Sequence, residues 1–168
     1  MKNFKELLSG VKVFVFDIDG VLTDGSVTIF PDGEMVRKFS TRDGYALQTA
    51  IEHGYRVAII SGAKSPALKK RLNDLGITDV YMNARDKKDP FDKFLLTYDI
   101  HPSEILIMGD DLPDYEIMKA CSVRTCPADA ANEIKTLCLY VSPKKGGEGC
   151  VRDVIEQVMK AQGKWFKD

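Results

Sequence analysis

Short apolar runs recur along the chain and alternate with segments of helical periodicity. Consecutive apolar positions, many of them β-branched, are typical of strands buried on both faces of a sheet. The runs that predict strands are residues 11–16, 56–60, 80–82, 105–108, the neighbourhood of Val123, and 137–141. The segments with helical spacing are residues 43–53, 65–75, 87–98, 113–120, 130–137 and 151–162. This alternation predicts an α/β fold, a doubly wound (Rossmann-like) parallel sheet with helices on both faces.

One segment interrupts the alternation between the first strand and the first helix. Two short runs with strand-like character flank Pro31-Asp32-Gly33 there, a strong turn signal. Such a turn between two strands is typical of a β-hairpin. We therefore expect a hairpin at about residues 25–40, projecting from a single domain over residues 1–168.

Composition excludes several classes of protein. The chain has 168 residues, 44% of them apolar and 29% charged, with a formal net charge of -1. The balanced charge gives no broad basic surface for nucleic acid. No run approaches the ~20 apolar residues of a membrane span, and the charged start does not resemble a secretory signal. The cysteines, Cys121, Cys126, Cys138 and Cys150, lack metal-binding spacing, so we expect buried free thiols and a cytoplasmic protein.

Acidic and polar side chains follow the predicted strands, at the sheet edge where ligands bind in this fold. In chain order they are Asp17 and Asp19, Ser61 and Gly62, Lys87, Asp110 and Asp111, and Asp114 one turn further. Clustered carboxylates without His or Cys favour a hard cation such as Mg²⁺, which would offset their mutual repulsion. The sequence therefore predicts a magnesium site at this edge.

These groups are suited to phosphoryl transfer. The cation, Lys87 and the Ser61 hydroxyl would form a positive, donor-rich pocket for a phosphoryl group. A carboxylate can attack phosphorus to give an aspartyl-phosphate. Of Asp17 and Asp19, one could be this nucleophile and the other a general acid and then base. The residues thus favour a phosphatase.

A phosphoacceptor signalling module, like a response-regulator receiver, is an alternative of another class. It shares the doubly wound sheet, the acidic residues, a hydroxyl and a lysine. Receivers place the phosphorylated Asp on a middle strand, whereas here the pair Asp17 and Asp19 follows the first strand. A receiver also lacks the second Asp that would hydrolyse its phosphate, so the enzyme is favoured.

The motifs DIDGVLTD, Ser61-Gly62, Lys87 and GDDLPD resemble, as a set, the four motifs of the haloacid dehalogenase superfamily. RDGYALQ, the spacing from SGAK to Arg71, and GGEGCVRD are similar to its small capless subfamily. That subfamily includes phosphatases of 3-deoxy-D-manno-octulosonate 8-phosphate (KDO 8-phosphate) and of 2-keto-3-deoxynononate 9-phosphate. The resemblance spans nearly the whole chain. It implies a Mg²⁺-dependent phosphoric monoester hydrolase that acts on a small sugar-acid phosphate in surface (lipo)polysaccharide biosynthesis.

The resemblance also implies a role for each motif residue. Asp17 would be the nucleophile, and Asp19 the acid and base, lending its backbone carbonyl to Mg²⁺. Asp110 would complete the metal site with Asp17, supported by Asp111 and Asp114. The implied phosphate ligands are Ser61, Gly62 and Lys87. Members of the subfamily are similar in forming homotetramers, in which hairpins meet at the centre and a neighbouring subunit partly covers each active site.

Two positions depart from the octulosonate pattern. Glu148 stands in GGEG, where GGRG is usual, and resembles the nononate type. Ala63 follows Ser-Gly, where neither group usually has alanine. An eight-carbon substrate is the main expectation, with a nine-carbon keto-deoxy or acylneuraminate 9-phosphate as the alternative. The glycines beside Glu148 could be plain loop residues or permit close approach to a ligand. The candidates for contact with the sugar acid, some across a subunit boundary, are Lys64, Arg71, Glu148 and Arg152.

Overall fold

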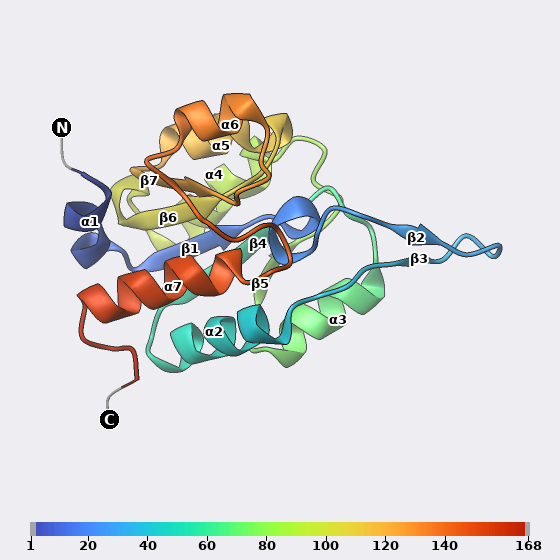
Figure 1. The fold of residues 1–168 in the computed structure, drawn as a ribbon, viewed down its shortest axis with the longest axis horizontal. Helices are drawn as coiled ribbons and strands as arrows, with labels where there is room; N and C mark the ends of the chain where they lie inside the picture. Colours follow the sequence, from blue (N-terminus) through green and yellow to red (C-terminus); the bar gives the residue numbers. More distant parts are fainter. Residues whose placement is uncertain (1–2, 167–168) are drawn as a thin grey trace.

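The computed structural model describes residues 3–166 and contains a six-stranded parallel sheet in the order β5-β4-β1-β6-β7-β8 (Figure 1). The strands are β1 (Val13–Phe16), β4 (Arg56–Ile60), β5 (Asp79–Tyr81), β6 (Ile105–Met108), β7 (Val123–Cys126) and β8 (Tyr140–Val141). The first strand is central, between β4 and β6, and all pairings in this sheet are parallel. The predicted doubly wound fold is confirmed.

Helices cover both faces of this sheet (Figure 1). Side chains alternate along β1, so Phe14 and Phe16 face one core while Val13 and Val15 face the other. The helices on the first face are α1 (Phe4–Leu7), α2 (Thr41–Glu52), α3 (Pro66–Asp74) and α7 (Cys150–Ala161). Those on the second face are α4 (Lys88–Tyr98), α5 (Tyr115–Ala120) and α6 (Asn132–Leu137). Burial on both faces explains why β1 and β6, at the centre of the sheet, are continuously apolar.

The predicted strand at residues 137–141 is shorter than its apolar run. The amide of Cys138 donates to the carbonyl of Ile134 at 3.1 Å, so the run begins as the last turn of α6. Only β8, two residues long, joins the sheet. Short 3₁₀ segments at Leu8–Gly10 (η1) and Pro102–Glu104 (η3) precede β1 and β6. Helical hydrogen bonds therefore replace strand pairing at Leu137 and Cys138, whereas the amide of Leu139 donates to the carbonyl of Arg124 at 2.9 Å.

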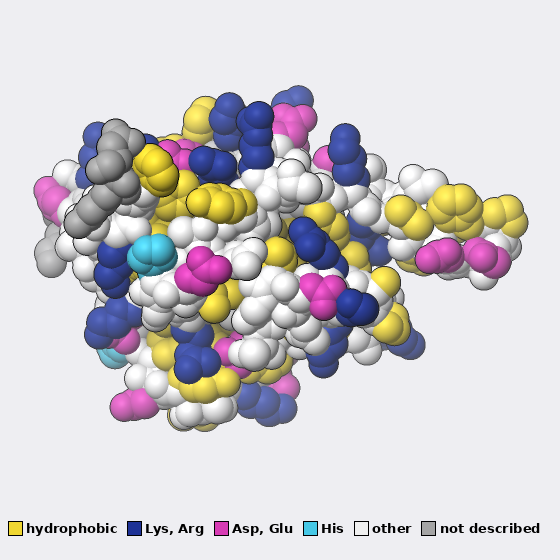
Figure 2. All heavy atoms as spheres, turned by 90° about the horizontal axis from the view of Figure 1, so that it is seen from below, with side chains coloured by type: hydrophobic (Ala, Val, Ile, Leu, Met, Phe, Trp, Pro, Cys, Tyr) yellow, Lys and Arg dark blue, Asp and Glu magenta, His cyan; other side chains and the backbone are white. Residues whose placement is uncertain are grey.

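The predicted hairpin projects from the body as β2 (Thr28–Ile29) and β3 (Met35–Val36), which pair antiparallel. Its turn closes where the amide of Gly33 donates to the carbonyl of Phe30 at 2.8 Å, with φ +85° at Gly33. Figure 2 shows hydrophobic side chains along this arm. The exposed fractions are 67% for Ile29, 46% for Phe30, 53% for Met35 and 44% for Val36. Within the described residues, the arm is thus a two-stranded sheet with a largely exposed apolar surface.

All four cysteines are free thiols, as expected from their spacing. Cys121, Cys126 and Cys150 are buried, and Cys138 is half-buried. Among residues 3–166, every helix is too short or too polar to cross a bilayer.

Candidate active site

The carboxyl ends of the strands enclose a cleft of about 490 Å³. The crossovers from β1 and β4 run to one side of the sheet, and the later crossovers run to the other. Ligands of doubly wound folds bind at this reversal. The structure brings all eight motif residues to the lining of this cleft: Asp17, Asp19, Ser61, Gly62, Lys87, Asp110, Asp111 and Asp114.

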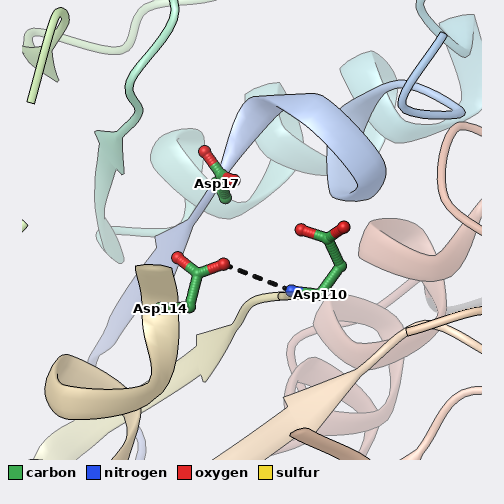
Figure 3. Close-up of side chains that lie close together, drawn as sticks. All are labelled: Asp17, Asp110 and Asp114. Carbon is green, nitrogen blue, oxygen red and sulfur yellow. Dashed lines mark hydrogen bonds between the residues drawn. The ribbon is translucent and has the colours of Figure 1, made fainter. Parts of the chain in front are cut away.

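Three carboxylates converge in the cleft (Figure 3). One oxygen from each of Asp17, Asp110 and Asp114 lies within 4.8 Å of the other two. Asp17 directly follows β1 and precedes the tight turn η2 (Ile18–Leu22), and its Oδ1 accepts a hydrogen bond from the amide of Ile18 at 2.7 Å. Asp114 ends the 3₁₀ turn η4 (Leu112–Asp114), and its Oδ2 accepts from the amide of Asp110 at 3.3 Å. Backbone contacts therefore hold the three acids together despite their repulsion.

Lys87 lies between two of these acids. Its Nζ is 3.0 Å from Asp17 Oδ2 and 2.7 Å from Asp114 Oδ1, and the residue is 4% exposed. Burial opposes the charged form, but the carboxylates of Asp114 and Asp17 outweigh it and raise the pKa of Lys87. The cleft thus holds one permanent ammonium group.

The acids still carry more negative charge than Lys87 offsets. Burial, then the nearby Asp114 and Asp17, raise the pKa of Asp110 to about 7. Burial, then Asp17, raise the pKa of Asp114 to about 6. The carboxylate of Asp110 accepts no hydrogen bond from any residue of the described chain, which leaves both oxygens for a ligand. An all-oxygen donor set with uncompensated charge fits a hard divalent cation.

Two glycines make room for this arrangement. A Cβ atom at Gly20, whose φ is +84°, would overlap the carboxylate of Asp110. A Cβ atom at Gly146 would overlap the backbone carbonyl of Gly20. The loop before α7 also donates a hydrogen bond from the Gly147 amide to the carbonyl of Val21 at 3.0 Å. The close approach in the structure is therefore to the chain's own loop after β1, and the expected approach to a ligand stays a prediction.

Asp43 joins the start of α2 to the start of α7. Its Oδ1 accepts a hydrogen bond from the amide of Arg152 at 2.7 Å, and the residue is 1% exposed. Its Oδ2 is buried without a partner among the described residues. Burial raises the pKa of Asp43 to about 6, although amide groups at the start of α7 favour the carboxylate. This contact anchors the glycine loop that supports the cleft.

Asp19 is held by the hairpin. Arg37, directly after β3, donates from Nε to Asp19 Oδ1 at 2.6 Å and from Nη2 to Asp19 Oδ2 at 3.0 Å. The Arg37 side chain is 7% exposed, and its hydrogen bonds to Asp19 raise the pKa of its guanidinium. Arg37 was not predicted from the sequence. A lone cation in a hairpin belongs to no motif, so only the tertiary contact identifies it.

The remaining lining residues come from loops. Ser61 is buried at the end of β4, and its Oγ accepts from the amide of Ala63 at 3.2 Å. Asp111 is exposed and caps η4. Arg85 also lines the cleft, is exposed, and its side chain forms no ion pair with another residue of the described chain. Sequence reasoning missed Arg85, for which proximity to Lys87 was the available signal.

The residues expected to contact the sugar acid do not line this cleft within one chain. Lys64 and Arg71 line a separate cavity of about 710 Å³ between the hairpin and α3. Glu148 is exposed. Arg152 donates to Glu156 at 3.3 Å along α7. Their roles toward a substrate stay predictions.

Comparisons with known proteins agree on one family. No family model matches the chain. It is 34% identical to 3-deoxy-D-manno-octulosonate 8-phosphate phosphatase KdsC of Yersinia pestis over 156 residues, covering 93% of this chain and 83% of that protein. The crystal structure of the Y. pestis phosphatase matches with a TM-score of 0.93 at 33% identity, covering 96% and 87%. The Moraxella catarrhalis phosphatase, solved with magnesium, phosphate and KDO, matches with a TM-score of 0.93 at 28% identity, covering 96% and 93%.

Proposed function

Because this chain belongs to the 3-deoxy-D-manno-octulosonate 8-phosphate phosphatase family of the haloacid dehalogenase superfamily, we propose that it is a Mg²⁺-dependent phosphatase of KDO 8-phosphate. The observation that carries this proposal is the position of Asp17. It lies in the cleft against both the ammonium group of Lys87 and the free carboxylate of Asp110. A nucleophile needs this environment, because the same surroundings bind the phosphoryl group that it attacks.

The chain's own residues divide the reaction into two steps. Asp17 attacks phosphorus while Asp19 gives a proton to the departing sugar oxygen, which leaves an aspartyl-phosphate and the free sugar acid. Asp19 then takes a proton from a water molecule as that water attacks phosphorus and releases Asp17. Lys87 and Ser61, with the amide of Gly62, hold the phosphoryl oxygens throughout.

Mg²⁺ is the cofactor that these donors fit. Asp17 and Asp110 would hold it through carboxylate oxygens, and the backbone carbonyl of Asp19 would complete the protein ligands. When bound, the ion neutralises charge on the phosphoryl oxygens and on the acids themselves. Asp114 supports this site by binding the Asp110 amide and Lys87.

A direct assay is phosphate release from KDO 8-phosphate, measured with Mg²⁺ and with EDTA. We expect turnover only with Mg²⁺. A nine-carbon keto-deoxy sugar acid 9-phosphate, assayed in parallel, tests the alternative substrate that GGEG favours. A larger kcat/KM for the nine-carbon substrate would overturn the eight-carbon assignment.

Asp17→Asn is the matched inactive variant. The amide keeps the size of the side chain but is a poor nucleophile, so we expect activity below about a thousandth of wild type. A phosphorylated residue trapped by acid quench should be present in wild type and absent from this variant. A long-lived aspartyl-phosphate with no release of product would instead favour the phosphoacceptor module.

We also propose that the chain forms a homotetramer through its hairpins, with a neighbouring subunit covering each cleft. The four exposed apolar residues of the arm (Ile29, Phe30, Met35 and Val36) support this, because apolar strands with open edges favour association. Light scattering should give the mass of four chains. Met35→Glu combined with Val36→Lys should reduce that mass, and an unchanged mass would exclude this interface.

A cytoplasmic role in surface polysaccharide biosynthesis is the corresponding cellular proposal. The four free thiols support a reducing compartment. Subcellular fractionation with thiol labelling of the unfolded protein tests this. Disulfide-bonded protein in an oxidising compartment would contradict it.

A further inference from the structure

The ion pair between Arg37 and Asp19 occupies both oxygens of the residue assigned as the general acid. Arg37 Nε lies 2.6 Å from Oδ1 and Nη2 lies 3.0 Å from Oδ2. The guanidinium only donates hydrogen bonds. When one oxygen of the carboxyl group carries the proton that it will donate, only the other oxygen can accept a hydrogen bond from the guanidinium. The bidentate pair is therefore a resting arrangement, and one contact must open for catalysis.

The distances indicate which contact opens. Oδ1 is the better-held oxygen, since Thr23 Oγ1 also lies 3.4 Å from it. Oδ2 has only the longer contact with Nη2. Arg37 is 7% exposed while Asp19 is 33% exposed, so the anchor is buried and the acid faces the cleft.

We propose that Arg37 is a positioning residue for Asp19, keeping Oδ1 in place while Oδ2 exchanges the proton. In the first step an Asp17 oxygen forms its bond to phosphorus, the bond from phosphorus to the sugar oxygen breaks, and the proton of Oδ2 moves to that oxygen. In the second step a water oxygen forms its bond to phosphorus, the bond from phosphorus to Asp17 breaks, and a proton of the water returns to Oδ2. Arg37 loses and gains no proton in either step. This inference rests on the proposed function, because both need Asp19 as acid and base.

Arg37 also links the hairpin to the proton transfer proposed for Asp19. Arg37 directly follows β3, and it contributes to the lining of the cavity between the hairpin and α3. Its contact with Asp19 is made across 18 positions of sequence. The hairpin is therefore not only an apolar arm but also the element that aligns the acid.

Leaving-group dependence separates positioning of the acid from a merely structural role. A sugar phosphate has an alkoxide leaving group that needs protonation, whereas p-nitrophenyl phosphate has a phenolate that needs it much less. General acid catalysis contributes about 10²–10⁴ in rate. Arg37→Met should forfeit part of this in the step that forms the aspartyl-phosphate, which kcat/KM reports. We expect kcat/KM to fall by about 10- to 100-fold for KDO 8-phosphate and by less than about 3-fold for p-nitrophenyl phosphate. The kcat for p-nitrophenyl phosphate should fall further than its kcat/KM, because hydrolysis of the aspartyl-phosphate needs Asp19 as the base for either substrate, so the KM for p-nitrophenyl phosphate should fall.

The controls test position, charge and shared mechanism. Lys38→Met removes a neighbouring exposed cation from the same arm and should leave both rates unchanged. Arg37→Lys can still donate to Oδ1 and should recover most of the loss. Asp19→Asn should show the same substrate dependence, and Arg37→Met in that background should add little, because the two residues act as a unit. Circular dichroism and light scattering verify that each variant is folded and assembled.

Each outcome decides one claim. Equal loss of kcat/KM on both substrates, no loss, or additive losses in the double variant would overturn the role of Arg37. Wild-type hydrolysis of KDO 8-phosphate would leave the proposed function standing. A wild-type chain that hydrolyses p-nitrophenyl phosphate but no alkyl phosphate would overturn both. The expected combination is a fast wild type and matching leaving-group dependence in Arg37→Met and Asp19→Asn.

Discussion

Replacing Lys87 by methionine tests the electrostatic account of the cleft most directly. Lys87→Met keeps most of the side-chain volume and removes the charge that lies 3.0 Å from Asp17 and 2.7 Å from Asp114. The two carboxylates stay buried, because their positions are set by the ends of β1 and η4. We expect a large loss of stability as well as of phosphatase activity.

The magnitude follows from the geometry. At an effective dielectric constant of about 20, unit charges 3 Å apart attract each other by roughly 5 kcal/mol. Two such contacts give on the order of 10 kcal/mol, from which the cost of burying the ammonium group is subtracted. Removing one partner of a buried ion pair typically costs about 3–5 kcal/mol. We expect a decrease in the free energy of unfolding within that range at pH 8 without Mg²⁺.

Protonation should relieve this loss. The pKa values of Asp110 and Asp114 are already raised to about 7 and about 6, and the loss of Lys87 removes a charge that opposes those shifts. A carboxyl group whose pKa is raised on folding stabilises the protein at low pH and loses that contribution as pH rises through the folded-state value. The stability deficit of Lys87→Met should therefore be smaller at pH 5.5 than at pH 8.

Urea unfolding followed by circular dichroism, in EDTA and at both pH values, measures these changes. Lys88→Met is the matched control, since Lys88 is exposed and its ion pair with Asp92 is open to solvent. Asp114→Asn in the Lys87→Met background should restore part of the stability and none of the activity. A Lys87→Met variant within about 1 kcal/mol of wild type at pH 8 would refute the reasoning, because a buried pair should cost several times that. A double variant less stable than the single one would also refute it.

Three other expectations follow from the same structure. Gly146→Ala should lower the free energy of unfolding by about 1–3 kcal/mol and impair turnover of p-nitrophenyl phosphate, because the added methyl group overlaps Gly20. Gly10→Ala is the control, since a methyl group there meets no neighbour. Equal urea midpoints for the two variants would contradict this packing. The pKa of Asp43 is raised to about 6, so the stability of Asp43→Asn should increase by up to about 3 kcal/mol relative to wild type as the pH rises from 4 to 8. A difference in urea unfolding that does not depend on pH would argue against a buried carboxylate. Mg²⁺ at about 100 times its Kd should stabilise wild type by roughly 2.7 kcal/mol in thermal melts, and Asp110→Asn should lose most of this gain if the carboxylate is a ligand.

The fold was largely predictable because its strands are buried on both faces. The strand residues Val13–Phe16 and Ile105–Met108 include no polar position, so each is readable as a core strand without tertiary information. Parallel order then places the residues after each strand at one edge, which is why Ser61 and Lys87 could be assigned to the site of Asp17. The run at residues 137–141 was misjudged in part, since short apolar segments satisfy a helix end and a strand equally well.

The chain sequence by itself determined the sheet, the set of acids with Lys87 and Ser61, and the demand for a cation, because these follow from local apolar patterning and from where parallel strands end. Only the tertiary structure decided that Arg37 holds Asp19, that Asp43 caps α7 and that Gly146 packs on Gly20. Each of these contacts joins segments far apart in the chain, either through one side chain or, between Gly146 and Gly20, through the lack of a side chain in glycine. Hydrophobic periodicity records burial against a core, but it carries no information about which distant polar group a given residue meets.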